Sequence, residues 1–130
     1  MTQEDRELLL KDLSARLPYD VIVQIRILES NEVIDEEFDY MWLGILYSEN
    51  PHHIIKPYLR PMSSMTEEEK AEFELLGWRV DELDNNHPWA HGSVDDTKGV
   101  DFLNSHHFDY RGLIEKGLAI EVTEENDPYV

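Results

Sequence analysis

Histidine and carboxylate side chains are the first candidates for chemistry in this chain, because together they bind transition metals. His87 and His91 stand four residues apart, a spacing that places two side chains on one face of a helix. Pro88 and Gly92 leave room for at most one helical turn there, so the spacing is weak evidence. We therefore predict no metal and no cofactor. If a metal does bind, the expected ligands are His87, His91, His107 and Asp109.

Other catalytic signatures are missing from the sequence. Ser63 and Ser64 precede a predicted helix, where serines act as caps, and no nucleophile-elbow motif is present. The chain has no cysteine, and its six glycines are scattered rather than gathered in a phosphate-binding loop. Carboxylates are so abundant that some pair will lie at the glycosidase distance by chance. The sequence thus predicts that the protein is not an enzyme.

A segment without acids, residues 50–66, is unusual in a chain that is otherwise rich in them. Three of its side chains could form a strip that binds an anion or a protein partner, namely Lys56, Tyr58 and Arg60. In the second interpretation, the segment packs its apolar side chains onto a sheet while its bases pair with acids of the same chain. We favour this second interpretation. The aromatic side chains predicted to lie in the core are Trp42, Phe73 and Trp78.

The first part of the chain predicts a helix followed by a hairpin. Thr2 and Asp5 resemble a capping box, and leucines then recur at helical spacing until Pro18. Residues 19–28 alternate with a period of two instead, which indicates a strand. A turn and a return strand follow, and the acids of residues 29–39 should keep the tip of this hairpin in solvent.

Residues 38–47 are the most apolar stretch of the chain. Their length, their aromatic side chains and their glycine favour a buried strand, in which Gly44 would form a bulge or a bend. A buried helix is the alternative. Further on, Pro57 and Pro61 require extended backbone in the residues before them.

Short helices and one strand are predicted for the second half. Thr66 and Glu69 form a capping box, and the helix that they start should end at Leu76 with Gly77 as a left-handed cap. The apolar contact expected to close this end joins Phe73 and Trp78. A further helix should begin near Lys98 and point Val100 and Leu103 inward.

The last part of the chain predicts one more helix and a final strand. Asp109 should cap the helix and Gly117 should end it, with an apolar contact between Leu113 and Leu118. Residues 118–122 then alternate as a strand. The polar residues 123–130 are expected to form a tail that frays.

Charge limits the partners of this protein. Its 130 residues include 29 acids and 11 bases, a formal net charge of −18 at neutral pH. Such a surface repels phosphate backbones, so we predict no nucleic-acid binding. It would attract a basic protein or imitate nucleic acid toward a nucleic-acid-binding protein, unless it serves solubility alone. The acidic N-terminus, the lack of cysteine and the short apolar runs favour a cytoplasmic protein outside membranes.

Three stretches of the sequence support a resemblance. They are Leu17-Pro18-Tyr19, residues 56–68, and residues 101–119 around His106-His107-Phe108-Asp109-Tyr110. Together they resemble a family of uncharacterised small acidic proteins encoded by gut Bacteroidetes and by their prophages and other mobile elements. The resemblance covers most of the chain outside residues 78–99. It implies a bacterial or phage cytoplasm and transfers no catalytic residue.

We therefore expect one α+β domain at residues 1–122, followed by the polar tail at 123–130. The fold should be a small antiparallel sheet or partly open barrel with three to four short helices. The predicted function is that of a non-enzymatic accessory or modulator protein that acts through protein–protein contacts. Two alternatives stay open, an inhibitor that mimics nucleic acid and a small metal-dependent enzyme.

Overall fold

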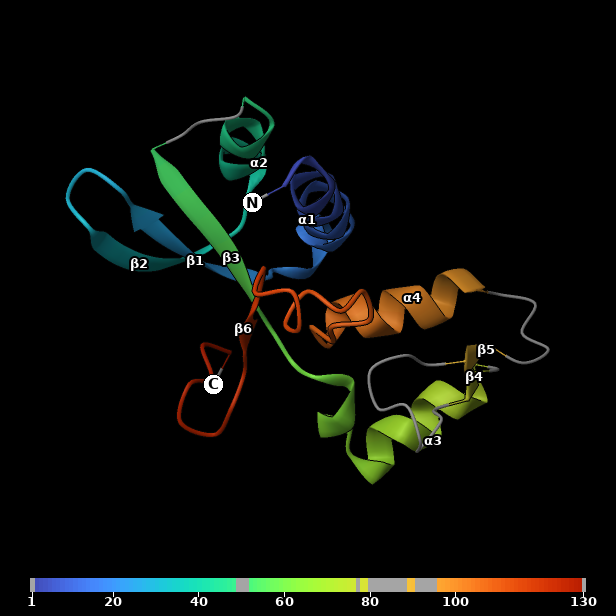
Figure 1. Ribbon diagram of the computed structural model, residues 1–130. Coiled ribbons are helices and arrows are strands. Elements are labelled where there is room, and N and C mark those ends of the chain that lie inside the picture. Colours follow the sequence, from blue (N-terminus) through green and yellow to red (C-terminus); the bar gives the residue numbers. More distant parts are fainter. Residues whose placement is uncertain (1, 49–51, 77, 80–88, 91–95, 130) are drawn as a thin grey trace.

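An open four-stranded sheet is the frame of the computed structural model (Figure 1). The structure describes residues 2–48, 52–76, 78–79, 89–90 and 96–129. Within these residues the strand order is β2-β1-β3-β6. The strands are β1 (Ile22–Ile27), β2 (Glu32–Glu37), β3 (His53–Leu59) and β6 (Ile120–Glu121). The expected α+β fold with a small sheet and several helices is confirmed.

The direction of the last strand differs from the expectation. β1 pairs antiparallel with β2 and with β3, but β6 runs parallel to β3 through Tyr58 and Leu59. The reason is the path of the chain, which leaves β3, passes through two helices away from the sheet, and returns in the same direction (Figure 1). The sheet is therefore mixed rather than antiparallel, and it is not closed into a barrel.

Strand register sorts the side chains onto two faces of the sheet. Ile25 lies opposite both Ile34 and Ile55, and this row packs with helices α1 (Gln3–Arg16) and α2 (Tyr40–Tyr47) in the main core. On the other face, Gln24 lies opposite Asp35 and Lys56. We call this second surface the open face. By alternation it carries Val33, Asp35, Glu37, Ile22, Gln24, Arg26, Ile54, Lys56 and Tyr58.

Helix α1 (Gln3–Arg16) covers the first face of the sheet. Thr2 caps its N-terminus with the predicted capping box, in which the Thr2 hydroxyl accepts a hydrogen bond of 3.0 Å from the Asp5 N–H. Leu9 and Leu13 are completely buried in the main core. The short 3₁₀ helix η1 (Leu17–Tyr19) follows, and its Pro18 stands in the first turn, where the missing N–H costs nothing.

Residues 38–47 are not the predicted strand. They contain helix α2 (Tyr40–Tyr47), which is the alternative that the sequence left open. The Asp39 carboxylate caps this helix by accepting a hydrogen bond of 3.2 Å from the Trp42 N–H. Phe38 and Trp42 are buried, whereas Gly44 is exposed on the helix and forms no bulge.

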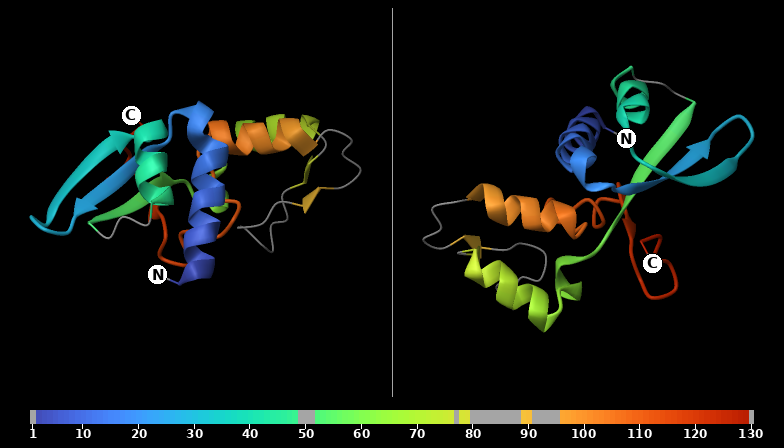
Figure 2. Two further views of the ribbon diagram at one scale, coloured as in Figure 1. Left: turned by 90° about the horizontal axis from the view of Figure 1, so that it is seen from above. Right: turned by 180° about the vertical axis from the view of Figure 1, so that it is seen from behind.

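The C-terminus of helix α2 is also capped, by a residue far away in the sequence, and no local sequence pattern predicts this contact. The Arg6 guanidinium of α1 donates hydrogen bonds of 2.9 Å to the carbonyl groups of Leu46 and Tyr47. These carbonyls have no partner inside the helix, and a cation at this end also suits the helix dipole. The two helices accordingly lie side by side (Figures 1 and 2).

A second, smaller core lies between helices α3 (Glu67–Leu75) and α4 (Asp96–Ser105), which run side by side away from the sheet (Figure 2). Its buried residues are Met62, Met65, Phe73, Leu103 and Phe108. The predicted capping box of Thr66 and Glu69 is confirmed. Gly77 and the Trp78 side chain lie outside the described residues. The two-residue strands β4 (Trp78–Arg79) and β5 (Trp89–Ala90) pair antiparallel nearby.

Residues 109–117 form turns, so the predicted helix capped by Asp109 is wrong, whereas the predicted left-handed conformation of Gly117 is confirmed. Asp109 accepts two backbone hydrogen bonds of 2.9 Å. Gly117 has a φ of +74°, and the Leu118 N–H bonds to the Leu113 carbonyl at 2.9 Å, as in a Schellman motif. A regular helix does not form because Gly112 is also left-handed, with a φ of +75°. Among the described residues no helix is long and apolar enough to span a membrane.

Replacing Gly117 by valine tests the left-handed turn. We expect Gly117→Val to destabilise the protein by more than about 1 kcal/mol, because a β-branched residue fits positive φ poorly. The matched control is Gly44→Ala, since a methyl group at either position meets no atom within 4 Å. The alanine should stabilise α2 by about 0.5–1 kcal/mol. Urea unfolding measures both, and equal effects would contradict the strain argument.

Candidate binding site

A pocket of about 510 Å³ opens where the β1–β2 hairpin meets the C-terminal segment. Residues from four parts of the chain line it, including the end of η1, the end of β2 and the residues after α4. Its polar and aromatic lining residues are Tyr19, Asp20, Glu37, Ser105, His107 and Tyr129. The pocket is shallow and lies largely open to solvent.

Two carboxyl groups stand together at this pocket. Asp20 lies within hydrogen-bonding reach of Glu37, and this contact together with charge repulsion raises the pKa of the Glu37 carboxyl above its ordinary value. Both residues are exposed. Among the described residues, no lysine or arginine forms an ion pair with either of them. The pair is thus an uncompensated negative charge beside a cavity.

Two residues of the pocket have strained backbone. Asp20 has a φ of 56° and His107 a φ of 63°, in the left-handed region that few residues other than glycine adopt. Aspartate and histidine tolerate this region better than most residues, but it still costs free energy. Strain of this kind concentrates at binding sites, because the surrounding structure must hold it in place.

His107 and Tyr129 form the aromatic wall of the pocket. Their rings stack at a centroid distance of 3.9 Å and an angle of 8°. Burial and the nearby Arg16 cation lower the pKa of His107 to about 4, so its ring is neutral at pH 7. The Tyr129 hydroxyl accepts a hydrogen bond of 3.0 Å from the Ile22 N–H and donates one of 2.7 Å to the Tyr58 carbonyl.

These contacts anchor the C-terminal segment. The expectation that residues 123–130 fray is therefore wrong for Tyr129, since its ring and its hydroxyl are both engaged. Burial also raises the pKa of the Tyr129 hydroxyl well above its ordinary value. The ring thus stays protonated and supplies a neutral wall at any physiological pH.

A buried ion pair holds the segment that carries His107. Arg16 and Asp12 are both completely buried, and Arg16 Nε lies 2.8 Å from Asp12 Oδ2. Arg16 Nη2 donates a hydrogen bond of 2.6 Å to the Phe108 carbonyl. Arg111 Nη1 reaches Asp12 Oδ1 at 2.9 Å, and the Tyr110 ring lies 5.2 Å from the Arg16 guanidinium and 4.5 Å from that of Arg111.

The predicted partner-binding strip is divided by the fold. Lys56 and Tyr58 lie on the open face, where the Tyr58 hydroxyl donates a hydrogen bond of 2.8 Å to Asp35. Arg60 instead makes two hydrogen bonds of 2.7 Å to Glu69. Arg60 is thus a base that pairs with an acid of the same chain, as the favoured interpretation expected, and Tyr58 also has an acidic partner. Binding by the strip stays a prediction.

The Arg60–Glu69 pair is a strong local contact. Burial alone would raise the pKa of Glu69, but the Arg60 guanidinium and the Thr66 N–H outweigh this effect and lower it to about 2. Arg60 also lies 4.2 Å above the Phe108 ring. The pair therefore ties the end of β3 to α3 and to the second core.

The metal ligands named from the sequence do not meet in the described part of the chain. His87 and His91 lie outside it. His107 stacks on Tyr129, and both oxygens of Asp109 accept backbone hydrogen bonds. No group of three histidine or acidic side chains in the described residues could hold a metal ion.

Sequence reasoning missed most of the pocket. Asp20, Glu37 and Tyr129 lie 17 or more residues apart, and no short motif connects them. The one available signal was an aromatic residue, Tyr129, in an otherwise polar tail. Comparisons with protein-family models, curated proteins and solved structures find no match for this chain.

Removing the charge of Asp12 tests the buried network. Asp12→Asn keeps the shape of the side chain but leaves Arg16 and Arg111 without a counter-charge. We expect a loss of about 3–5 kcal/mol in the free energy of unfolding, as for other broken buried pairs. Lys11→Met on the exposed side of the same helix should change it by less than about 0.5 kcal/mol. A loss below about 1 kcal/mol for Asp12→Asn would contradict the assigned role.

The pKa of His107 predicts a pH dependence of stability. Because this pKa is about 4 in the folded protein and near 6.5 when unfolded, the unfolded chain binds more protons between these values. Stability should therefore fall as the pH drops from 6.5 to 4. In His107→Asn, which suits a left-handed backbone, the slope should decrease by up to about 1.4 kcal/mol per pH unit.

Urea unfolding across this pH window measures the slope. Tyr129→Phe is the control, because it removes the hydroxyl contacts of the same stack without removing a group that titrates in this window. It should lower stability by a similar amount at every pH. An unchanged slope in His107→Asn would show that another group dominates.

Proposed function

We propose that this protein is a non-enzymatic accessory or modulator protein of a bacterium or its phage. It acts in the bacterial cytoplasm by binding a basic protein. The binding element in this proposal is the edge strand β2, which pairs with an extended basic segment of the partner. One observation carries the proposal: β2 is an acidic strand whose outer edge has no neighbour within the described sheet.

The backbone of β2 supports strand pairing. Hydrogen bonds of an antiparallel pair alternate along each strand. The Phe38 N–H bonds to the Val21 carbonyl of the neighbouring chain segment at 2.9 Å. The amides of Val33, Asp35 and Glu37 therefore point away from β1, toward the free edge. An added strand would satisfy these groups, which is the recurring mode of peptide recognition at sheet edges.

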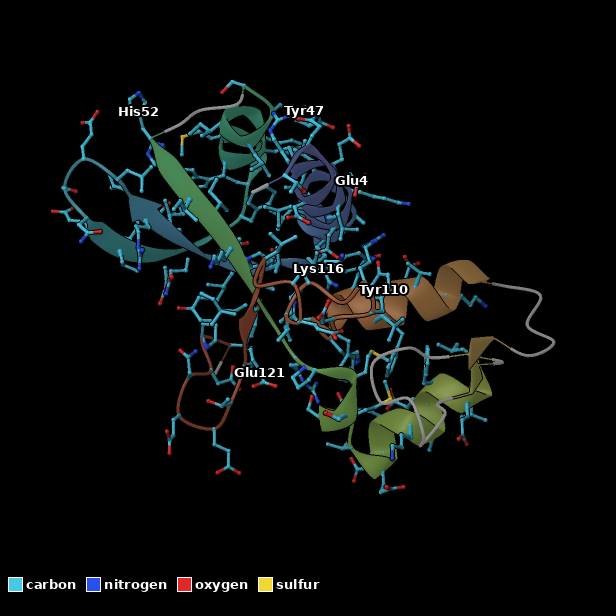
Figure 3. The ribbon with its side chains drawn as sticks, in the orientation of Figure 1. Glu4, Tyr47, His52, Tyr110, Lys116 and Glu121 are labelled. Atoms are coloured by element: carbon cyan, nitrogen blue, oxygen red, sulfur yellow. The ribbon has the colours of Figure 1, made fainter. Side chains whose placement is uncertain are left out.

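The side chains of β2 support a basic partner. Four of the six residues of β2 are acidic, and only Ile34 of the strand is partly buried. Oxygen-tipped side chains are visible along the side of the hairpin that β2 and its turn form (Figure 3). Like charges on facing strands are destabilising, so a second copy of this chain is rejected while a lysine- or arginine-rich strand is accepted. Val33, which is 47% exposed, offers apolar contact between the acids.

An inhibitor that mimics nucleic acid would use the same charge in another way. Such a protein presents carboxylates in place of phosphates and needs no free backbone edge. The outward amides of Val33, Asp35 and Glu37 favour strand pairing over this alternative. Competition by DNA for the same partner would favour the mimic.

A synthetic peptide of about eight residues that alternates lysine and valine tests the proposal, since strands commonly have five or six residues. On binding, amide hydrogen exchange should slow at Val33, Asp35 and Glu37. The amide of Glu36 faces β1 and is the internal control. A peptide that alternates glutamate and valine should leave all four rates unchanged.

Charge reversal separates the edge from general electrostatics. The variant Glu32→Lys/Asp35→Lys/Glu37→Lys should lose the lysine peptide and gain the glutamate peptide. The control Glu4→Lys/Glu7→Lys/Glu72→Lys has the same net charge, but its changes lie on helices α1 and α3. Equal loss of binding in both variants would mean that net charge rather than β2 binds the peptide, and the proposal would fail.

A further inference from the structure

The pocket lies in line with the proposed peptide path. Glu37 is the last residue of β2 and also lines the pocket. A strand that pairs along β2 therefore reaches the pocket with one of its ends. We propose that this pocket binds the guanidinium group of an arginine side chain, which anchors the basic segment of the partner. This inference rests on the proposed function, because it names the anchoring residue of the same partner.

The carboxyl pair matches a guanidinium group in charge and in shape. Asp20 and Glu37 both line the pocket, and their carboxyl groups interact with each other, so both can face one cation. A guanidinium presents a planar fork of N–H donors and can bond two carboxyl groups at once. Its charge would replace the repulsion between the two acids by attraction. An ammonium group supplies one point charge without this fork.

The aromatic wall gives the guanidinium plane a surface. Tyr19, His107 and Tyr129 all contribute to the lining of the pocket. The Tyr19 hydroxyl is held by a hydrogen bond of 2.8 Å to Asp101, and Tyr129 is held through its own hydroxyl. Guanidinium groups stack on aromatic rings better than ammonium groups do. The rings are thus fixed before a ligand arrives, which reduces the entropy lost on binding.

The charges around the pocket do not oppose a cation. His107 is neutral at pH 7, and the charge of Arg16 behind it is paired with Asp12. Ser105 donates its hydroxyl to the Phe102 carbonyl and adds no charge. The remaining charged lining residues are the two acids. A metal ion is a poorer fit, since the described residues offer no group of three ligands.

Arginine with neutral ends is the direct probe. N-acetylarginine amide should shift the amide resonances of Asp20, Glu37, His107 and Tyr129 in a saturable way, with a dissociation constant on the order of 1 mM. N-acetylcitrulline amide has nearly the same shape but no charge, and it should cause no saturable shift. Equal shifts with both compounds, or none with the arginine compound, would overturn the inference.

Two conservative variants locate the site. Asp20→Asn keeps a residue that tolerates positive φ, and Glu37→Gln keeps the strand geometry. Each should weaken arginine binding by about tenfold or more, since each removes a charge-assisted hydrogen bond. Glu4→Gln, on the far end of α1, makes the same charge change outside the pocket and should have no effect (Figure 3). Unchanged affinity in both pocket variants would place the arginine elsewhere.

The two proposals can fail separately. If N-acetylarginine amide binds the pocket but the lysine–valine peptide leaves the β2 amides unprotected, the arginine site stands and strand pairing is wrong. If the peptide protects β2, and replacing its end residue by arginine improves binding less than about twofold, strand pairing stands and the arginine anchor is wrong.

Discussion

The buried ion pair of Arg16 and Asp12 is the contact on which the other parts of this structure depend. Taking two charges out of water costs several kcal/mol for each ion, and further hydrogen bonds of the pair offset part of this cost, although Arg16 Nη1 has no hydrogen-bond partner among the described residues. Asp12 accepts a hydrogen bond from Arg111, and Arg16 donates one to the Phe108 carbonyl. Both contacts come from a segment about 90 residues later in the chain. The last turn of α1 is thereby locked to the residues that follow α4, and the main core is joined to the second core.

The position of this pair also determines the chemistry of the pocket. Holding Phe108 against Arg16 fixes the left-handed backbone of His107, and the neighbouring cation helps to keep the His107 ring neutral. The neutral ring can then stack on Tyr129, whose hydroxyl bridges the neighbouring strands β1 and β3 through Ile22 and Tyr58. A buried positive charge behind the wall thus coexists with an exposed negative pair in front of it. The pocket therefore has a neutral aromatic wall although the surface around it is strongly acidic.

Local signals predicted local structure well. The capping boxes at Thr2 and Thr66, the β1–β2 hairpin and the left-handed Gly117 were all readable, because each depends on residues within a few positions of one another. The stretch 38–47 was misassigned for the opposite reason. A run that is apolar nearly throughout has no clear period, so strand and helix explain it equally well. Helix α2 is stabilised by Asp39, which caps its N-terminus, and by Arg6 of helix α1, which bonds to carbonyl groups at its C-terminus.

The sequence by itself determined the charge, the α+β class, the capped starts of α1 and α3 and the absence of cysteine chemistry, since these follow from composition and short-range pattern. Only the tertiary structure decided which acids are free and which are used. Glu69 forms an ion pair with Arg60, and Asp12 pairs with two arginines. Asp20 and Glu37 instead lie together without a cationic partner among the described residues. The tertiary structure also anchors the C-terminal segment through Tyr129, although the sequence predicted that this segment frays. Pairings of this kind join residues far apart in sequence, and their free energy exists only once burial has lowered the local dielectric and fixed the geometry.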